Sequence, residues 1–236
     1  MKKFFNIFLS LLIVSFVSPL FAATIKWSMP GDSLTLDPHA QNEGPTHMVS
    51  RQVYEGLVTH DIGMNIKPQL ATSWENTDPE TWIFNLREGV KFHDGSDFTA
   101  DDVLFTAKRA QNVPKSPSGF GTYLKGKEVI KIDSHTIHIK TSKPYPLMPN
   151  DIMTVKIISK KHGEGASTAD YNSGKAAIGT GPYKFVKWVP GDKIVLKANK
   201  DYHGAGRGMP KFDNILFKPI KSGPARIAAL LAKDVD

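Results

Sequence analysis

The sequence predicts an α/β protein with a mixed sheet and several hairpins. Segments typical of strands and helices are interspersed along the chain, without the strict strand–helix–strand alternation of an all-parallel sheet. In two places, a pair of strand-like segments is joined by a short turn. These are residues 128–132 and 136–140 around Asp133-Ser134-His135, and residues 183–189 and 193–198 around Pro190-Gly191-Asp192. Turns of this composition join antiparallel neighbours.

Further strands are expected at residues 24–29, 82–87 and 212–218, which are rich in apolar and aromatic side chains. Residues 90–93 predict a short extended piece before a turn. The glycine-rich residues 178–182 predict a tight turn instead of a phosphate loop, because a strand-like segment follows them and no Gly-Lys-Ser/Thr sequence is present.

Three helices are expected. Residues 47–58 carry apolar side chains at helical spacing, with Thr46 as the expected cap and an end near Gly56. Thr99, with Asp102 three residues later, has the pattern of a shortened capping box and opens a helix that continues to residue 110. The last helix opens at Ser222-Gly223-Pro224 and places on one face Ile227, Leu230 and Leu231.

Residues 1–22 have the pattern of a secretory signal peptide. A basic start is followed by an apolar stretch and by small residues around Ala22. The apolar stretch is shorter than the about 20 residues that a membrane-spanning helix needs, so we favour a cleaved signal over an anchoring helix. Since no cysteine follows the stretch, a lipid-anchored protein is excluded. We expect cleavage after Ala22 and a soluble exported protein.

Composition excludes several classes of site. The chain of 236 residues is 40% hydrophobic and 10% aromatic, which is typical of a globular protein. The absence of cysteine excludes a disulfide framework, a thiolate zinc site, an iron–sulfur cluster and a cysteine nucleophile. The formal net charge is +7, but the densest basic group is only Lys156, Lys160 and Lys161. We therefore expect a solvated basic surface and no nucleic-acid partner.

No motif for catalysis is visible. The sequence contains neither His-Glu-x-x-His nor Gly-x-Ser-x-Gly. His135 and His138 are placed on opposite faces of the expected hairpin, and Asp101 with Asp102 suits a helix start better than paired acid–base chemistry. We expect no enzyme, no metal and no cofactor.

One stretch carries a specific resemblance. It comprises residues 70–74 (LATSW), residues 82–95 (WIFNLREGVKFHDG) and residues 98–103 (FTADDV). It resembles the signature of the extracellular solute-binding protein family 5, the peptide/nickel-type binding components of ABC importers. Other segments are similar to the family in its own order: residues 36–39, 54–57, 178–183, 199–202, 210–213 and 225–236, with Lys233 where glycine is commoner.

The resemblance implies a periplasmic-binding-protein-like (type II) fold, in which two lobes close over a ligand like a clam. Residues 23–236 are expected to form the N-terminal lobe only, with an inserted subdomain at about 41–175 and the second lobe absent. The chain is therefore expected to be a truncated or partial product. The family further implies a periplasmic monomer that delivers its ligand to permease subunits in the inner membrane.

The resemblance also places candidate ligand-binding residues in two loops. Residues 41–45 contribute Asn42, Glu43 and Gly44, of which Glu43 suits an amine or a cation. Residues 119–123 contribute Phe120 and Tyr123, since the family often has an aromatic near Tyr123 facing the cleft. An ordinary polar loop is an equal alternative for the first set, and core packing is an equal alternative for the aromatics.

Peptides or similar small solutes are the leading ligand class. Nickel chelates, haem, opines and oligosaccharides are alternatives within the family. A secreted hydrolase with an unrecognised site, or a fragment that binds nothing, are the alternatives of another class.

Overall fold

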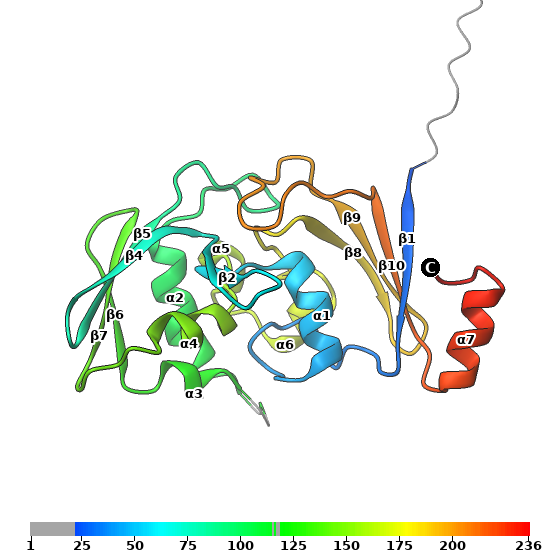
Figure 1. Cartoon of the computed structure of the whole chain (residues 1–236), viewed down its shortest axis with the longest axis horizontal. Coiled ribbons are helices and arrows are strands. Elements are labelled where there is room, and N and C mark those ends of the chain that lie inside the picture. The colour runs from blue at the N-terminus through cyan, green and yellow to red at the C-terminus, as the bar shows by residue number, and fades with distance from the viewer. Residues whose placement is uncertain (1–21, 115, 117–118) are drawn as a thin grey trace, which may run out of the picture.

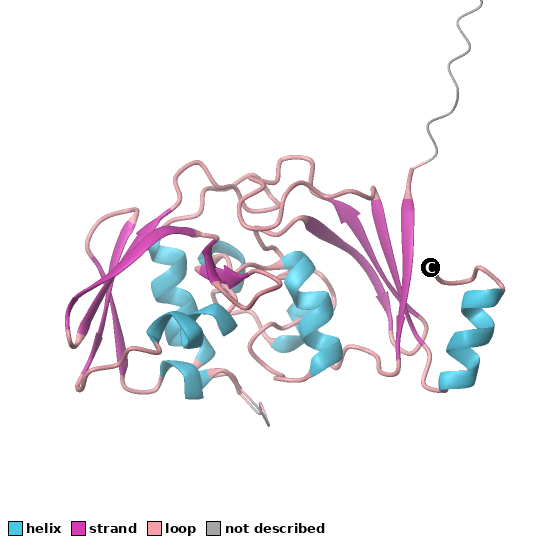
Figure 2. Ribbon diagram, viewed as in Figure 1, coloured by secondary structure: helices cyan, strands magenta, loops and turns pink. Residues whose placement is uncertain are grey.

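The structure is a computed structural model that describes residues 22–114, 116 and 119–236. Two four-stranded sheets lie at opposite ends of an elongated molecule, with most of the helices between them (Figures 1 and 2). The α/β class and the mixed sheet with hairpins are confirmed. The expected signal peptide falls almost wholly on residues outside the described part, and β1 (Thr24–Met29) begins just after it.

The first sheet is built from both ends of the chain. Strand β1 pairs in parallel with β10 (Asn214–Pro219), which continues antiparallel into β9 (Lys193–Ala198) and β8 (Tyr183–Val189). The sequence predicted all four strands, with the start of β10 two residues too early. Helix α1 (Gly44–Val53) packs beside β8, and its buried Val49 and Val53 join the core of this sheet.

The second sheet is antiparallel, in the order β4 (Ala71–Asp78), β5 (Thr81–Leu86), β7 (Thr136–Thr141) and β6 (Lys127–Lys131). Helix α2 (Ala100–Ala110) covers one face, above a core that includes Phe84. All four strands lie between β1 and β8 in the sequence. The subdomain boundaries at about 41 and 175 stay a prediction.

Short elements connect the two sheets. The hairpin of β2 (Val58–His60) and β3 (Ile66–Pro68) forms a separate two-stranded sheet, and its buried Val58 packs into the core of the second sheet. The described residues also form four short helices: α3 (Gly121–Leu124), α4 (Met148–Thr154), α5 (Lys160–Gly163) and α6 (Thr168–Asn172). None was predicted, because helices of four to seven residues are too short to show a helical period.

The helix starts test the capping predictions. At α2 the capping box is confirmed, since the Thr99 hydroxyl accepts from the Asp101 amide and the Asp102 carboxylate accepts from the Thr99 amide. At α1 the expected cap and bounds were wrong: Glu43 is the cap, and the helix runs from Gly44 to Val53. The Thr46 hydroxyl instead accepts from the Leu34 amide at 3.0 Å.

Helix α7 (Gly223–Leu231) starts at Ser222 as predicted, and the Ser222 hydroxyl accepts from the Ala225 amide. No residue of α7 is buried in the described chain, and Ile227, Leu230 and Leu231 are all more than half exposed. Among the described residues, no helix combines the length and apolar character needed to cross a membrane.

The turn at residues 178–182 is a structural element, as predicted. A side chain at Gly179 or Gly181 would overlap the backbone at the end of α1. The Gly181 amide donates to the Val53 carbonyl at 2.9 Å, and Thr180 is fully buried between the two glycines. These glycines permit a close approach of two backbone segments.

Candidate ligand-binding site

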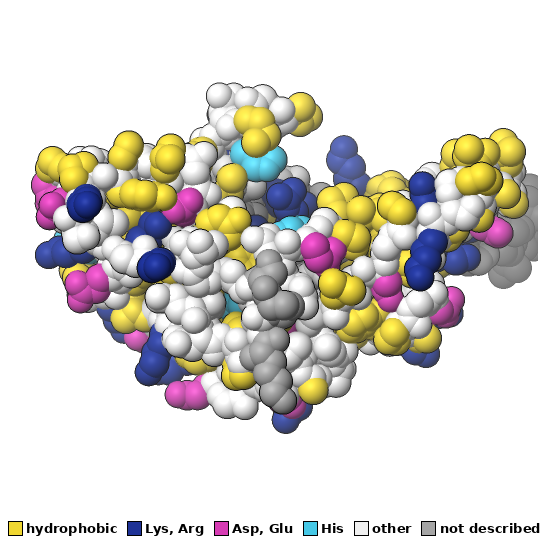
Figure 3. Space-filling model, turned by 90° about the horizontal axis from the view of Figure 1, so that it is seen from below, with side chains coloured by type: hydrophobic (Ala, Val, Ile, Leu, Met, Phe, Trp, Pro, Cys, Tyr) yellow, Lys and Arg dark blue, Asp and Glu magenta, His cyan; other side chains and the backbone are white. Residues whose placement is uncertain are grey.

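An open cavity of about 710 Å³ lies between α1, the β2–β3 hairpin, the end of α4 and the loop at residues 203–208. Seen from below, this side of the molecule is hollowed near its middle, with basic and histidine side chains around the hollow (Figure 3). The lining combines amide, hydroxyl, imidazole and charged groups with a few apolar side chains. Cavities of this size accommodate small organic ligands.

Two of the predicted ligand-binding residues meet at the wall of this cavity. The Asn42 side-chain amide donates to the Tyr123 hydroxyl at 3.2 Å, and its oxygen accepts from His47 Nε2 at 2.7 Å. All three side chains line the cavity. Burial lowers the pKa of His47, and the charges of Arg51 and Lys156 lower it further. His47 is therefore a neutral donor to Asn42 near pH 7.

The other three predicted residues do not line the cavity. The Glu43 carboxylate turns back to cap α1, where it accepts from the Thr46 amide at 3.0 Å. Gly44 is exposed, and a side chain there would meet nothing, so no close approach requires this glycine. Phe120 is 1% exposed and packs against His39, His47 and Tyr123. It supports the cavity wall from the core.

Three basic residues that were not predicted as ligand contacts also line the cavity: Arg51, Lys156 and Arg207. Arg51 lies in the last turn of α1, Lys156 follows α4, and Arg207 lies in the loop after β9, where its guanidinium donates to the Arg51 carbonyl. The one available sequence signal was Lys156, a lysine within the apolar run Val155 to Ile158. The arginines lie 156 residues apart, so their proximity follows only from the fold.

Lys156 is 9% exposed, and its ammonium lies 3.4 Å from the Met153 carbonyl oxygen. Burial lowers the pKa of Lys156 to about 7, because a charged ammonium is poorly solvated inside a protein. The positive charges of Arg51 and Arg207 contribute to this lowered pKa, and Glu55 opposes them. Near neutral pH this ammonium loses its proton far more readily than an exposed lysine does.

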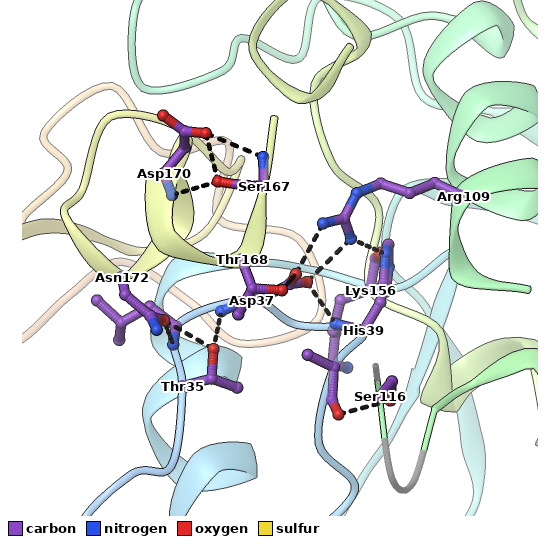
Figure 4. A network of polar contacts seen from close by, with 12 residues as sticks. Thr35, Asp37, His39, Arg109, Ser116, Lys156, Ser167, Thr168, Asp170 and Asn172 are labelled. Atoms are coloured by element: carbon purple, nitrogen blue, oxygen red, sulfur yellow. Dashed lines mark hydrogen bonds and ion pairs between the residues drawn. The ribbon is translucent and has the colours of Figure 1, made fainter. Parts of the chain in front are cut away.

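A buried polar network fixes the backbone at Lys156 (Figure 4). Arg109 donates to both Asp37 carboxylate oxygens, at 2.9 and 2.7 Å, and also to His39 Nδ1 at 3.1 Å. His39 Nε2 then donates to the Lys156 carbonyl at 2.7 Å. Thr168 adds a hydrogen bond to Asp37 at 2.8 Å. The first loop, α2 and the segment that carries Lys156 are thereby joined.

The charges in this network are matched. Burial alone would raise the pKa of Asp37, but the hydrogen bonds and charge of Arg109 outweigh it and hold that pKa below its usual value. Burial, together with Arg109, lowers the pKa of His39 to about 4. His39 is therefore neutral at pH 7, as its two hydrogen bonds require.

A second buried cluster holds the loop that carries Arg207. Glu55 is fully buried and accepts from Gln69 at 2.9 Å, from the Tyr202 hydroxyl at 2.7 Å and from His203 Nε2 at 2.7 Å. Burial, and then the charge of Glu55, raise the pKa of Tyr202. The hydroxyl therefore stays protonated as a donor. Glu55 thus anchors one wall of the cavity.

Within the described residues, no group of three or more His, Cys, Asp or Glu side chains is arranged to hold a metal ion. The cavity lining is that of a binding site, since it combines the neutral hydrogen-bonding groups of Asn42, His47 and Tyr123 with the cations Arg51, Lys156 and Arg207.

Comparison with known proteins identifies the family. Residues 65–236 match the bacterial extracellular solute-binding proteins, family 5 middle region. The chain belongs to this family. Its fold is that of type II periplasmic binding proteins, and the chain corresponds to one lobe. The family consists of substrate-binding proteins of transport systems.

Among curated relatives, the glutathione-binding protein GsiB of Pectobacterium atrosepticum is 30% identical over 217 residues, covering 90% of this chain and 41% of GsiB. The periplasmic oligopeptide-binding protein OppA of Salmonella typhimurium is 28% identical over 221 residues, covering 86% of this chain and 40% of OppA. The chain thus spans about two fifths of the length of these relatives.

Among solved structures, NikZ from Campylobacter jejuni in complex with Ni(L-His) superposes with a TM-score of 0.80 and 28% identity. The match covers 90% of this chain and 42% of NikZ. The NikZ structure contains Ni(L-His), whereas the names of GsiB and OppA give glutathione and oligopeptides as their ligands. Relatives of this chain therefore bind chemically different small solutes.

Proposed function

We propose that this chain supplies one ligand-binding face of a periplasmic substrate-binding protein, which binds di- or oligopeptides or a similar small solute for an ABC importer. The observation that carries this proposal is the open cavity in which Asn42, His47 and Tyr123 form a hydrogen-bonded polar wall. Peptide ligands need donors and acceptors for their amides, and this wall offers both. The names of GsiB and OppA support the ligand class.

The proposed function also includes a periplasmic location and permease partners. The chain is exported by its N-terminal 22 residues, works as a monomer in the periplasm, and hands its ligand to permease subunits in the inner membrane. It binds without catalysis. Cell fractionation with N-terminal sequencing tests the first part, since the mature protein should begin at Ala23. A membrane-associated protein that retains residues 1–22 would contradict it.

Thermal unfolding with a ligand panel tests the binding function. The panel contains di- to pentapeptides, glutathione and the nickel–histidine chelate. A ligand present at 100 times its Kd stabilises the folded state by about 2.7 kcal/mol, which is readily measured. We expect peptides to raise the Tm. Chromatography of the recovered peptides should show no cleavage.

Two variants make the test specific to the site. Tyr123→Ala should abolish the peptide-dependent rise in Tm, because it removes both the hydroxyl and the ring from the cavity wall. Thr122→Ala is the matched control, since Thr122 is exposed and does not line the cavity. If only the nickel chelate raises the Tm, the peptide assignment is wrong. If nothing in the panel does, the binding function is wrong for this chain.

A further inference from the structure

The charges that line the cavity are unbalanced. Among the described residues that line the cavity, Arg51, Lys156 and Arg207 face one carboxylate, Asp61. That carboxylate is already engaged, since it accepts from the Asn65 side chain and lies 3.4 Å from the ammonium of Lys67. The cavity therefore presents a local excess of positive charge to whatever enters it.

The cations of the cavity have no acidic partner in the part of the chain that the structure describes. None of Arg51, Lys156 and Arg207 is within ion-pair distance of a described carboxylate. Glu55 attracts Lys156 from nearby, but Gln69, Tyr202 and His203 already occupy its oxygens.

Among the three cations, Lys156 most clearly lacks a counter-charge and hydrogen-bond acceptors in the described part of the chain. Its ammonium has three N–H donors, and among the described residues its one acceptor is the Met153 carbonyl at 3.4 Å, which is a long contact. The side chain lies at the cavity wall although it is more than nine-tenths buried. A buried cation without a counter-charge is costly. The two arginines are exposed, so they are free to reach a ligand that sits above Lys156.

We propose that Arg51, Lys156 and Arg207 form a subsite for a carboxylate group of the ligand, which extends the function proposed above and rests on it. The carboxylate lies on the Lys156 ammonium, and the arginines cover it from the cavity mouth. The uncharged remainder of the ligand contacts Asn42 and Tyr123. Either the C-terminal carboxylate of a peptide or an acidic side chain supplies the chemistry that this subsite requires.

Proton linkage gives this subsite a signature. A bound carboxylate raises the pKa of Lys156 above about 7, so binding takes up a proton when the pH lies between the free and bound values. Affinity is therefore greatest below pH 7 and falls as the pH rises above it. The other groups that act on Lys156 are Arg51, Arg207 and Glu55, and His47 also faces it. Because the pKa of His47 is lowered, His47 gains charge only at acid pH.

Four probes separate the sources of the carboxylate in titration calorimetry. They are tri-alanine as the free acid, tri-alanine amide, Ala-Glu-Ala amide and succinate. If the subsite takes a C-terminus, the free acid binds more tightly than its amide by about 10- to 100-fold, as for a charge-assisted hydrogen bond. If it takes an acidic side chain, Ala-Glu-Ala amide binds as tightly as the free acid or more tightly.

Three variants complete the test. Lys156→Met should reduce the affinity of the carboxylate probes by at least about tenfold and remove the fall in affinity above pH 7, while tri-alanine amide is unaffected. Lys156→Arg should restore carboxylate binding without that fall. Lys160→Met is the matched control, since Lys160 is exposed and does not line the cavity.

The outcomes distinguish this inference from the function on which it rests. If the free acid, the amide and the glutamate probe bind equally well and Lys156→Met changes nothing, the carboxylate subsite is wrong and peptide binding stands. If succinate binds in a Lys156-dependent way but no peptide does, the subsite stands and the peptide function is wrong. If none of the four probes binds, both proposals are wrong.

Discussion

Replacement of Lys156 by methionine should stabilise the ligand-free protein. Methionine has nearly the same length as lysine and removes the buried charge. The pKa of Lys156 falls from 10.5 to about 7 on folding, and at about 1.4 kcal/mol for each pH unit this costs about 5 kcal/mol when the lysine is protonated in both states. Loss of the long contact with the Met153 carbonyl offsets about 1 kcal/mol of the gain. We expect Lys156→Met to raise the free energy of unfolding at pH 6 by roughly 2–4 kcal/mol.

The pH dependence isolates the charge from packing. Between pH 7 and 10.5 the unfolded chain holds a proton on Lys156 that the folded chain has released, so the stability of the unsubstituted protein rises with pH in this window. The advantage of Lys156→Met should therefore shrink from pH 7 toward pH 10. Urea unfolding, followed by tryptophan fluorescence at pH 6, 8 and 10, measures it.

The exposed Lys160→Met variant should show no such trend at any of the three pH values. A Lys156→Met variant that is less stable than the unsubstituted protein, or whose effect does not depend on pH, would refute the reasoning. Either result would mean that the ammonium is well solvated or well paired in the folded state.

Three further predictions concern the aromatic pair Phe120 and Tyr123, the buried ion pair of Arg109, and the glycine at position 179. Phe120→Ala should lower the free energy of unfolding by about 3–5 kcal/mol because the ring is buried, whereas Tyr123→Phe should weaken peptide binding in calorimetry with a stability change under about 1 kcal/mol. Arg109→Met should lower the free energy of unfolding by about 3–5 kcal/mol at pH 7.5, measured by urea unfolding, because it leaves the buried Asp37 carboxylate unpaired. The loss should be smaller at pH 4.5, where the unpaired Asp37 carboxylate is more readily protonated. Gly179→Ala should lower the Tm sharply or prevent soluble expression, since its Cβ overlaps the Val53 carbonyl, while Gly44→Ala should leave the Tm unchanged. A tolerated Gly179→Ala would show that this turn moves away from α1 at little cost.

Local chemistry explains which elements could be predicted. The two hairpins and the α2 capping box depend on residues within a few positions of one another, so their patterns are complete in the sequence. Strand β4 was not recognised because only Ala71 of its eight residues is buried, as befits the edge of a sheet, and it shows no apolar alternation. The α1 cap was misplaced because threonine is the commoner capping residue, whereas the fold directs Thr46 toward Leu34.

The site was only partly predictable for a related reason. Asn42 and Tyr123 were proposed from separate loops, and only the fold shows that they share a hydrogen bond. The fold also shows that Phe120 points into the core, which the sequence left open. The cations come from three distant segments, and the apolar residues around Lys156 indicate its burial but not its proximity to Arg51 and Arg207. Their clustering is a tertiary property that no local pattern encodes.

The backbone around Lys156 explains how the fold keeps an uncompensated cation at the cavity. On one side, the His39 imidazole holds the Lys156 carbonyl, and on the other the Ile157 amide donates to the Glu55 carbonyl at 2.7 Å. Val155 and Ile157 are both buried in the core, so the segment cannot rotate to carry the ammonium into open solvent without exposing them. The contacts that stabilise the lobe therefore also direct this charge into the cavity. The gain in stability and the loss of carboxylate affinity in Lys156→Met therefore have one cause, which is the removal of the buried charge. If a substitution of Lys156 changed only one of these two quantities, the buried charge would not be the group that binds the carboxylate.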